Sequence, residues 1–358
     1  MQRNKISFKG QTIYVGIDVH KKAWHVTLLT ESGNVRRLSI GPSAQTLFEI
    51  LKKHYPDGTY RAVYESGFSG FATYYSLQEA GIDCIVIHAA DVPTTQYESA
   101  MKTDRIDSEK LARSLKAGLL KGVYIRERDN IDDRSVIRLR KTVQKQLAGY
   151  KARVKHLLHT NGAMLPERFA MAGPYWSKAF TKWLKEDVKL LSATRTSLDL
   201  LILQVESIRT NLLRINLEIR KLSQTDRYSE KFNLLLSIPG IGTYAAMSIL
   251  TEVYNVNRFQ NERQFASYLG LIPTCHCSGE KDLHGEKTFR GNKKLGPAIV
   301  ESCWVAIRKD FGLSACYSSY KQRMTSQEAI IRIARKMANI IYSVLKTGSP
   351  YVPYQVDK

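Results

Sequence analysis

The sequence has 358 residues, of which 43% are apolar, so it is long enough for two or three globular domains with cores of their own. Lys and Arg number 54 against 33 Asp and Glu, a formal charge of +21 that favours nucleic acid as partner over a merely basic soluble protein. The polar start MQRNKISFKGQT and the lack of an 18-residue apolar run argue against a signal peptide or membrane span, and predict a cytoplasmic location.

The first 90 residues show strand and helix patterns in alternation. Three strand-like stretches, IYVGIDV, WHVTLLT and VRRLSI, precede the helical pattern SAQTLFEILKKHY. The stretch YRAVYE then indicates a buried strand, GFATYYSLQEAG a helix that ends at Gly81, and DCIVIH another strand. This βββαβαβ order, followed by one more helix, predicts an α/β domain with a mixed sheet and flanking helices.

The middle of the chain shows two long helical patterns. Residues 134–161 hold eight Lys or Arg and no acid, with apolar residues at three-four spacing, which predicts a basic amphipathic helix. Residues 198–222 repeat apolar side chains every seven positions, as in a coiled coil. The repeat allows pairing between chains or an antiparallel hairpin with the 134–161 helix in one chain.

The last third opens with LLLSIPGIGTYAAMSILTEV at 234–253, two helical patterns that resemble a helix-hairpin-helix motif. In such a motif, backbone N–H groups near Gly240 and Gly242 hold a phosphate; the alternative is a tight turn that contacts nothing. A loop rich in Gly and Lys follows, then a helix near 327–346. The five cysteines lack CxxC spacing, so we expect free thiols, although CHC at 275–277 offers possible metal ligands.

Four carboxylates form the strongest candidate site. Asp18 and Glu65 end two predicted strands, and Asp104 and Asp107, at i and i+3, share one face of a helix. In a ribonuclease H-like fold these positions meet at one edge of the sheet. Four acids in one small volume need a counter-charge, which two Mg²⁺ ions bound by oxygen ligands would provide.

Each acid alone also has an ordinary explanation: a turn cap, an ion pair, or the favourable dipole of a first helical turn. The combination in this element order is what favours a metal site. His20 and His25 lie close to Asp18 in the sequence. A solvated or hydrogen-bonded histidine is the expected state of both.

Five motifs in order resemble the IS110 family of insertion-sequence transposases: YVGIDVHKK, YESGFSG, KTDRIDSEKLA, IPGIGTYAAMSIL and the ASYLGLIP to RGNKKL region. The resemblance covers residues 13 to 345. It implies a RuvC-like domain with a DEDD metal site on Asp18, Glu65, Asp104 and Asp107, a coiled-coil middle, and a C-terminal transposase domain with a nucleophilic serine, Ser278 of the CSG sequence. Family members are also described as recombinases guided by a structured noncoding RNA.

The sequence therefore predicts an α/β N-terminal domain of ribonuclease H-like (RuvC-like) type at 1–128, a basic and coiled-coil region at 129–228, and a mainly helical domain with a helix-hairpin-helix-like motif at 229–358. The expected function is a DNA transposase or recombinase that uses Mg²⁺ or Mn²⁺ and is guided to DNA by a structured noncoding RNA. We expect it to work as a homo-oligomer, a dimer or tetramer. The candidate nucleic-acid contacts are Arg138, Lys141, Lys145, Gly240, Gly242, Arg290, Asn292 and Lys293.

Two other functions stay open from the residues. One is a metal-dependent, structure-specific nuclease of the Holliday-junction type that attacks with water in place of Ser278. The other is a nucleic-acid-binding protein without catalysis. A covalent protein–DNA adduct separates the first prediction from both alternatives.

Overall fold

The computed structural model describes residues 7–96, 103–169, 175–278, 281–287 and 291–353. The chain divides into two compact units, Met1–Ile125 and Arg126–Lys358. Among the described residues, no helix combines the length and apolar composition needed to cross a bilayer.

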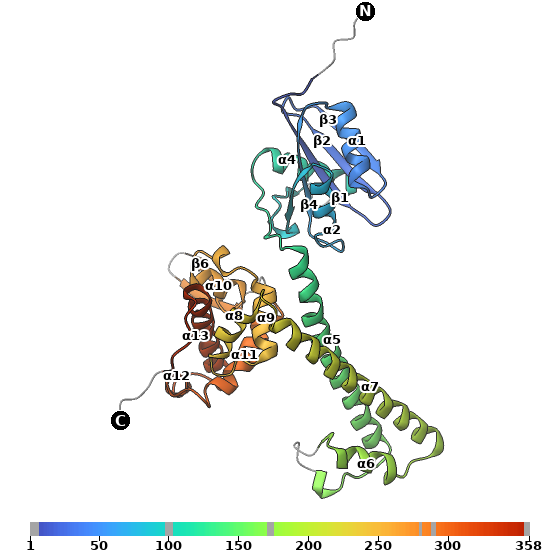
Figure 1. The fold of residues 1–358 in the computed structure, drawn as a ribbon, viewed down its shortest axis with the longest axis vertical. Helices are drawn as coiled ribbons and strands as arrows, with labels where there is room; N and C mark the ends of the chain where they lie inside the picture. The colour runs from blue at the N-terminus through green and yellow to red at the C-terminus, as the bar shows by residue number, and fades with distance from the viewer. Residues whose placement is uncertain (1–6, 97–102, 170–174, 279–280, 288–290, 354–358) are drawn as a thin grey trace, which may run out of the picture. The chain divides into compact units, whose positions relative to one another are not determined.

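The N-terminal unit contains the expected mixed sheet (Figure 1). Its strand order is β3-β2-β1-β4-β5, with β1 antiparallel to β2, β2 antiparallel to β3, and β1, β4 and β5 parallel. The predicted order of three strands, helix, strand, helix, strand is confirmed. The strands are β1 (Thr12–Val19), β2 (Trp24–Leu29), β3 (Val35–Ile40), β4 (Thr59–Glu65) and β5 (Asp83–Ile87).

Helices cover the two faces of this sheet. Because side chains alternate along a strand, Ile13, Val15 and Ile17 of β1 all point to one face, where they share a core with Leu47 of α1 and Leu77 of α2. The other face packs on α4, so α1 and α4 lie on opposite sides of the sheet (Figure 1). The helices are α1 (Ala44–His54), α2 (Ala72–Glu79), η1 (Ala89–Asp91) and α4 (Asp104–Lys116).

Helix α4 lies unusually close to β1 at Gly16. A Cβ atom at Gly16 would lie 2.0 Å from the Ser108 carbonyl oxygen and 2.6 Å from the Ala112 backbone nitrogen. Next to this contact, the buried hydroxyls of Thr27 in β2 and Ser108 in α4 are hydrogen-bonded at 2.9 Å. Glycine at this position therefore fixes the height and the register of α4 on the sheet.

The C-terminal unit is built on a long helical hairpin of α5 (Arg128–Thr160) and α7 (Ser192–Ser223), which pack along each other. Ile137 near the start of α5 shares a core with Ile219 near the end of α7, so the helices are antiparallel. At the other end, Val154 packs with Leu198 and with η2 (Glu167–Phe169) and α6 (Lys178–Glu186). The heptad seam thus packs within one chain, which is the hairpin alternative.

The rest of this unit is a helical domain around one core (Figure 1). Its final long helix, α13, begins at a capping box of Thr325 and Glu328 and ends at Gly348 in the left-handed region, close to the predicted bounds. A two-stranded hairpin, β6–β7, occupies the stretch expected to be a loop. The elements are α8 (Ser229–Leu236), α9 (Thr243–Val253), η3 (Val256–Arg258), α10 (Glu262–Tyr268), β6 (Pro273–Ser278), β7 (Lys281–Lys287), α11 (Leu295–Ala306), α12 (Phe311–Lys321) and α13 (Ser326–Thr347).

The turn between α8 and α9 packs against α11. Gly240 has φ +87°, and a Cβ there would lie 2.3 Å from the Ser302 carbonyl oxygen, so its backbone touches the side of α11. At Gly242, the N-cap of α9, a Cβ would have no heavy atom within 4 Å. Packing against α11 therefore explains why residue 240 is a glycine. At Gly242 no such contact exists among the described residues, so the N-terminus of α9 is uncovered at this position.

We expect Gly16→Ala to destabilise the N-terminal unit by about 2 kcal/mol or more, because the added methyl overlaps the backbone of α4 and the helix must move. Gly41→Ala is the matched control, since a Cβ there meets nothing within 4 Å. Urea unfolding followed by circular dichroism measures both. Equal stabilities of the two variants would contradict the close packing.

Candidate active site and basic cluster

The edge of the sheet at the C-terminal ends of β1 and β4 holds two of the predicted acids. Asp18 lies two residues after Gly16 in β1, so its side chain points to the same face of the sheet, the face that α4 covers. Tyr64 of β4 pairs with Ile17, which brings the next residue, Glu65, alongside Asp18. These two acids therefore sit on neighbouring strands and on the face that α4 covers.

The other two acids lie in the first turn of α4. Thr103 caps this helix by accepting a hydrogen bond from the Ile106 backbone N–H at 3.3 Å. Because Gly16 lets Ser108 rest on β1, the preceding turn, with Asp104 and Asp107, comes to the end of the same strand. Local capping and one glycine contact thus carry the helical acids to the sheet edge.

Two histidines of the sheet edge contact these acids. His20 Nε2 lies 3.1 Å from Asp18 Oδ2 and 3.6 Å from Asp104 Oδ1. His25, the pairing partner of Asp18 in β2, places Nε2 at 3.2 Å from Asp104 Oδ2. The expectation of a hydrogen-bonded histidine is met by His20, whose ring links the strand acid Asp18 to the helix acid Asp104, while the His25 ring contacts Asp104.

The donor set suits a divalent cation. One donor atom each from Asp18, His20 and Asp104 lies within 4.8 Å of the other two. Carboxylate oxygens are the ligands of Mg²⁺ and Mn²⁺, and an imidazole nitrogen adds to the affinity for Mn²⁺ and later transition metals. Among the described residues, Glu65 and Asp107 do not belong to this trio; the Asp107 carboxylate contacts Lys110 Nζ at 3.3 Å.

Comparison with known proteins gives the family. Residues 15–161 match the model of the DEDD transposase domain of IS110 type, and residues 232–318 match that of the IS116/IS110/IS902 transposase family. The chain belongs to the IS110 family of transposases. The resemblance inferred from the motifs is thereby confirmed.

Curated relatives agree with this assignment. A putative transposase of Sinorhizobium fredii is 24% identical over 78% of this chain and 70% of its own length. The transposase for insertion sequence element IS1533 of Leptospira borgpetersenii is 26% identical over 70% of this chain and 72% of its own. The pilin gene-inverting protein of Moraxella bovis is 31% identical, over 36% of this chain and 40% of its own. DNA recombination is thus the shared activity, and a DEDD domain implies a divalent metal.

The predicted nucleophile of this IS110-family protein lies in the other unit. Ser278 is the last residue of β6, and its backbone pairs with Lys281 of β7 across the hairpin. Of the predicted contacts around it, Arg290 lies outside the described residues. Lys293 is exposed just before α11.

Asn292 has a structural role at the start of α11. Its side-chain oxygen accepts hydrogen bonds at 3.0 Å from the backbone N–H groups of Lys294 and Leu295. Its amide nitrogen donates to the Tyr268 hydroxyl at 3.1 Å and to Glu252 Oε2 at 3.3 Å. Asn292 thus both caps the helix and joins a buried polar network.

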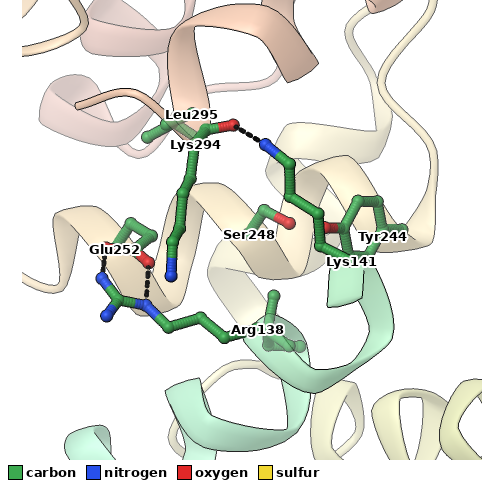
Figure 2. Close-up of a pocket in the computed structure, with 8 residues that line it drawn as sticks. Arg138, Lys141, Tyr244, Ser248, Glu252, Lys294 and Leu295 are labelled. Atoms are coloured by element: carbon green, nitrogen blue, oxygen red, sulfur yellow. Dashed lines mark hydrogen bonds and ion pairs between the residues drawn. The ribbon is translucent and has the colours of Figure 1, made fainter. Parts of the chain in front are cut away.

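Glu252 is the centre of that network. It is 3% exposed, and its carboxylate accepts two hydrogen bonds from Arg138, at 2.7 and 3.1 Å (Figure 2). Arg134 approaches it at 3.5 Å, and Arg126 donates to its backbone carbonyl at 2.8 Å. We call Arg126, Arg134, Arg138, Lys141 and Lys294 the basic cluster, because charge interactions link these side chains to each other and to Glu252.

The network gives Arg138, one of the predicted nucleic-acid contacts, a partner within the protein. Its guanidinium is paired with a buried carboxylate, while Lys141 and Lys145 are exposed on the same helix. Sequence reasoning missed Glu252, although two signals pointed to it: it is the lone acid at the end of the apolar helix SILTEV, and the acid-free segment 134–161 needs partners from elsewhere. It also gave no role to His20 and His25 at the acidic edge.

We expect Glu252→Gln to lower the free energy of unfolding by about 2–3 kcal/mol at pH 7, because it leaves the partly buried Arg134 and Arg138 without their counter-charge. Burial raises the pKa of Glu252, but Arg138, Arg134 and Arg126 outweigh it and lower the pKa. Since the folded pKa lies below the unfolded value of about 4.3, this stabilisation is present above pH 4.3 and lost as pH falls through the folded pKa.

Urea unfolding at pH 7 and near pH 3 should therefore show a smaller difference between wild type and Glu252→Gln in acid. Glu218→Gln, at an exposed ion pair on α7, is the control and should change stability by less than about 1 kcal/mol. A loss of the same size at both pH values would show that the charge of Glu252 is not what stabilises the unit.

Proposed function

We propose that this protein cleaves and rejoins DNA strands to move its insertion sequence, with Ser278 as nucleophile and a divalent metal held by Asp18, Glu65, Asp104 and Asp107. The observation that carries the proposal is the convergence of Asp18, His20 and Asp104 at one sheet edge in a chain of the IS110 family. Asp18 of β1 and Asp104 of α4 are 86 positions apart in the sequence and meet at this edge.

We infer that the N-terminal unit is a ribonuclease H-like (RuvC-like) domain. The strand order β3-β2-β1-β4-β5, with only β2 antiparallel to both of its neighbours, supports this, as does α4 packed over β1. The proposed divisions near residues 128 and 228 then separate this domain, the α5–α7 hairpin and the helical domain. The α8–α9 turn is proposed as a helix-hairpin-helix-like phosphate contact through Gly242.

The chain's own groups account for the proposed steps. The Ser278 hydroxyl attacks a phosphodiester; a serine–phosphorus bond forms, the bond to one sugar oxygen breaks, and that oxygen takes up a proton. A bound Mg²⁺ or Mn²⁺ would stabilise charge on the attacking and leaving oxygens. Attack by the freed sugar oxygen of another strand reverses the step, so the bond energy is retained for rejoining. Water as nucleophile would lose it.

Two further parts of the proposal concern partners. We propose a structured noncoding RNA as guide, which the resemblance implies and the charge of +21 favours. We also propose a homo-oligomer, a dimer or tetramer. The seam residues Leu198, Val205 and Ile219 are buried in the hairpin, so assembly through α7 would need another of its faces. Sequencing of RNA that co-purifies with the protein tests the first, and light scattering the second.

Strand cleavage should require Mg²⁺ or Mn²⁺ and stop in excess chelator. Either ion should also raise the thermal unfolding midpoint of the wild type, because a ligand that binds only the folded state stabilises it. Asp104→Asn should remove both effects. Glu49→Gln, which removes the same charge from an exposed position on α1, should keep both. Full cleavage in chelator would exclude the metal.

Ser278→Ala should reduce strand exchange by roughly 10³-fold or more and abolish a covalent protein–DNA adduct, seen on denaturing gels as a slow band that protease removes. DNA binding should stay near the wild-type level, because no charge is lost. Ser318→Ala, at an exposed serine of α12, is the control. Cleavage by wild type without any adduct would favour the nuclease that uses water, and an adduct formed by Ser278→Ala would exclude this serine.

A further inference from the structure

A small pocket lies within the C-terminal unit, between α5, α9 and the start of α11 (Figure 2). Its lining includes Lys141, Tyr244, Ser248 and Lys294, with the Arg138–Glu252 pair at one side. Lys141 Nζ donates to the Lys294 carbonyl at 3.3 Å, which ties α5 to the start of α11 across the pocket. The proposed transposition chemistry assigns no role to this pocket.

Ser248 brings an unusual polar group into the pocket. The residue is 6% exposed, and among the described residues its buried hydroxyl has no hydrogen-bond partner. Other hydroxyls in these helices bond to the carbonyl four residues earlier, as Thr251 does with Met247 at 2.8 Å and Ser302 with Ala298 at 3.0 Å. An unsatisfied buried hydroxyl costs about 1–3 kcal/mol, so a bound group that accepts its hydrogen bond is expected.

The charged side chains around the pocket indicate which sign of charge the bound group carries. The basic cluster has five cations, and among the described residues the carboxylate of Glu252 is the anion that interacts with Arg134, Arg138 and Lys294. Partial burial and then the charge of Arg138 lower the pKa of the Lys294 ammonium, and burial followed by Arg126 and Arg138 lowers the pKa of Arg134. The cations therefore repel one another, and an anion in the pocket would relieve that repulsion.

We propose that the pocket binds one phosphodiester of a nucleic-acid backbone, with a non-bridging oxygen accepting a hydrogen bond from Ser248 and with its charge facing Lys141 and Lys294. The pocket volume of about 10 Å³ admits one oxygen-sized atom. A phosphodiester can insert a single oxygen and leave the rest of the group at the mouth. The site rests on the proposed function for its nucleic-acid ligand, and it places a phosphate beside Tyr244 and Ser248 of α9.

The first test uses inorganic phosphate and the full-length protein. Phosphate should raise the thermal unfolding midpoint of wild type above that in chloride at equal ionic strength. Ser248→Asp should abolish the difference, because the new carboxylate occupies the pocket. Ser318→Asp adds the same charge at an exposed position and should keep it, which corrects for general stabilisation by phosphate. An equal phosphate effect in both variants would overturn the site, and would leave the pocket to a water molecule.

The second test measures binding of a fluorescent DNA or RNA duplex in fluorescence anisotropy, with no metal. Ser248→Asp should weaken binding about tenfold and reduce the slope of log affinity against log salt by about 0.9, the loss of one phosphate contact. Ser248→Ala should weaken it roughly fivefold with the slope unchanged, since only a hydroxyl is removed. Wild-type affinity in Ser248→Ala would contradict the hydrogen bond.

Two further comparisons show whether the ligand is an internal phosphodiester and whether its binding is independent of Ser278. Duplexes with 5′-phosphate and 5′-hydroxyl ends should bind equally, and dependence on the end phosphate would overturn an internal phosphodiester. The Ser278→Ala protein should bind like wild type in all these measurements. If the wild type forms no covalent adduct but Ser248→Asp still reduces the salt slope, the proposed serine chemistry is refuted and the phosphate site is kept. If the wild type forms the adduct and Ser248→Asp leaves the slope unchanged, the phosphate site alone is refuted.

Discussion

The contact between α4 and β1 at Gly16 determines where the acidic edge forms. Without a side chain on Gly16, the helix backbone rests directly on the strand, and the Thr27–Ser108 hydrogen bond fixes its rotation. The helix turn that carries Asp104 then lies over the strand end that carries Asp18. A helix raised by even one methyl group would separate donor atoms that need to stay within a few ångströms, so a packing constraint in the core sets the geometry of the surface site.

The C-terminal unit depends on a different constraint, the burial of one carboxylate among cations. Glu252 lies near the end of the apolar helix α9 and accepts hydrogen bonds from Arg138 on α5 and Asn292 before α11. It thereby adds directional hydrogen bonds between three elements that also share the apolar core. The same arrangement concentrates more positive charge than one carboxylate can balance, so the residue that joins the helices also creates an anion-attracting surface.

Periodicity and short apolar runs between turn residues predicted most of the regular elements. They were sufficient for the strands β1 to β5 and for the helices α1, α5, α7 and α13. Helix α11 is apolar nearly throughout, LGPAIVESCWVA, and carries an early proline, so its pattern did not distinguish it from a buried strand or loop. The strand-end acids were predictable from position, whereas His20, His25 and Glu252 enter their sites through pairing and packing between distant segments.

The α5–α7 hairpin joins two separate apolar cores, one around Ile137 and Ile219 and one around Val154 and Leu198. The helices have 33 and 32 residues, so each is about 50 Å long at 1.5 Å per residue. Between the two cores, only the repeating seam has to match. Removal of one heptad from each helix would keep the facing residues in register and shorten the hairpin by about 10 Å. The hairpin therefore sets the distance between the two cores, and its length can be changed in whole heptads without a change in either core.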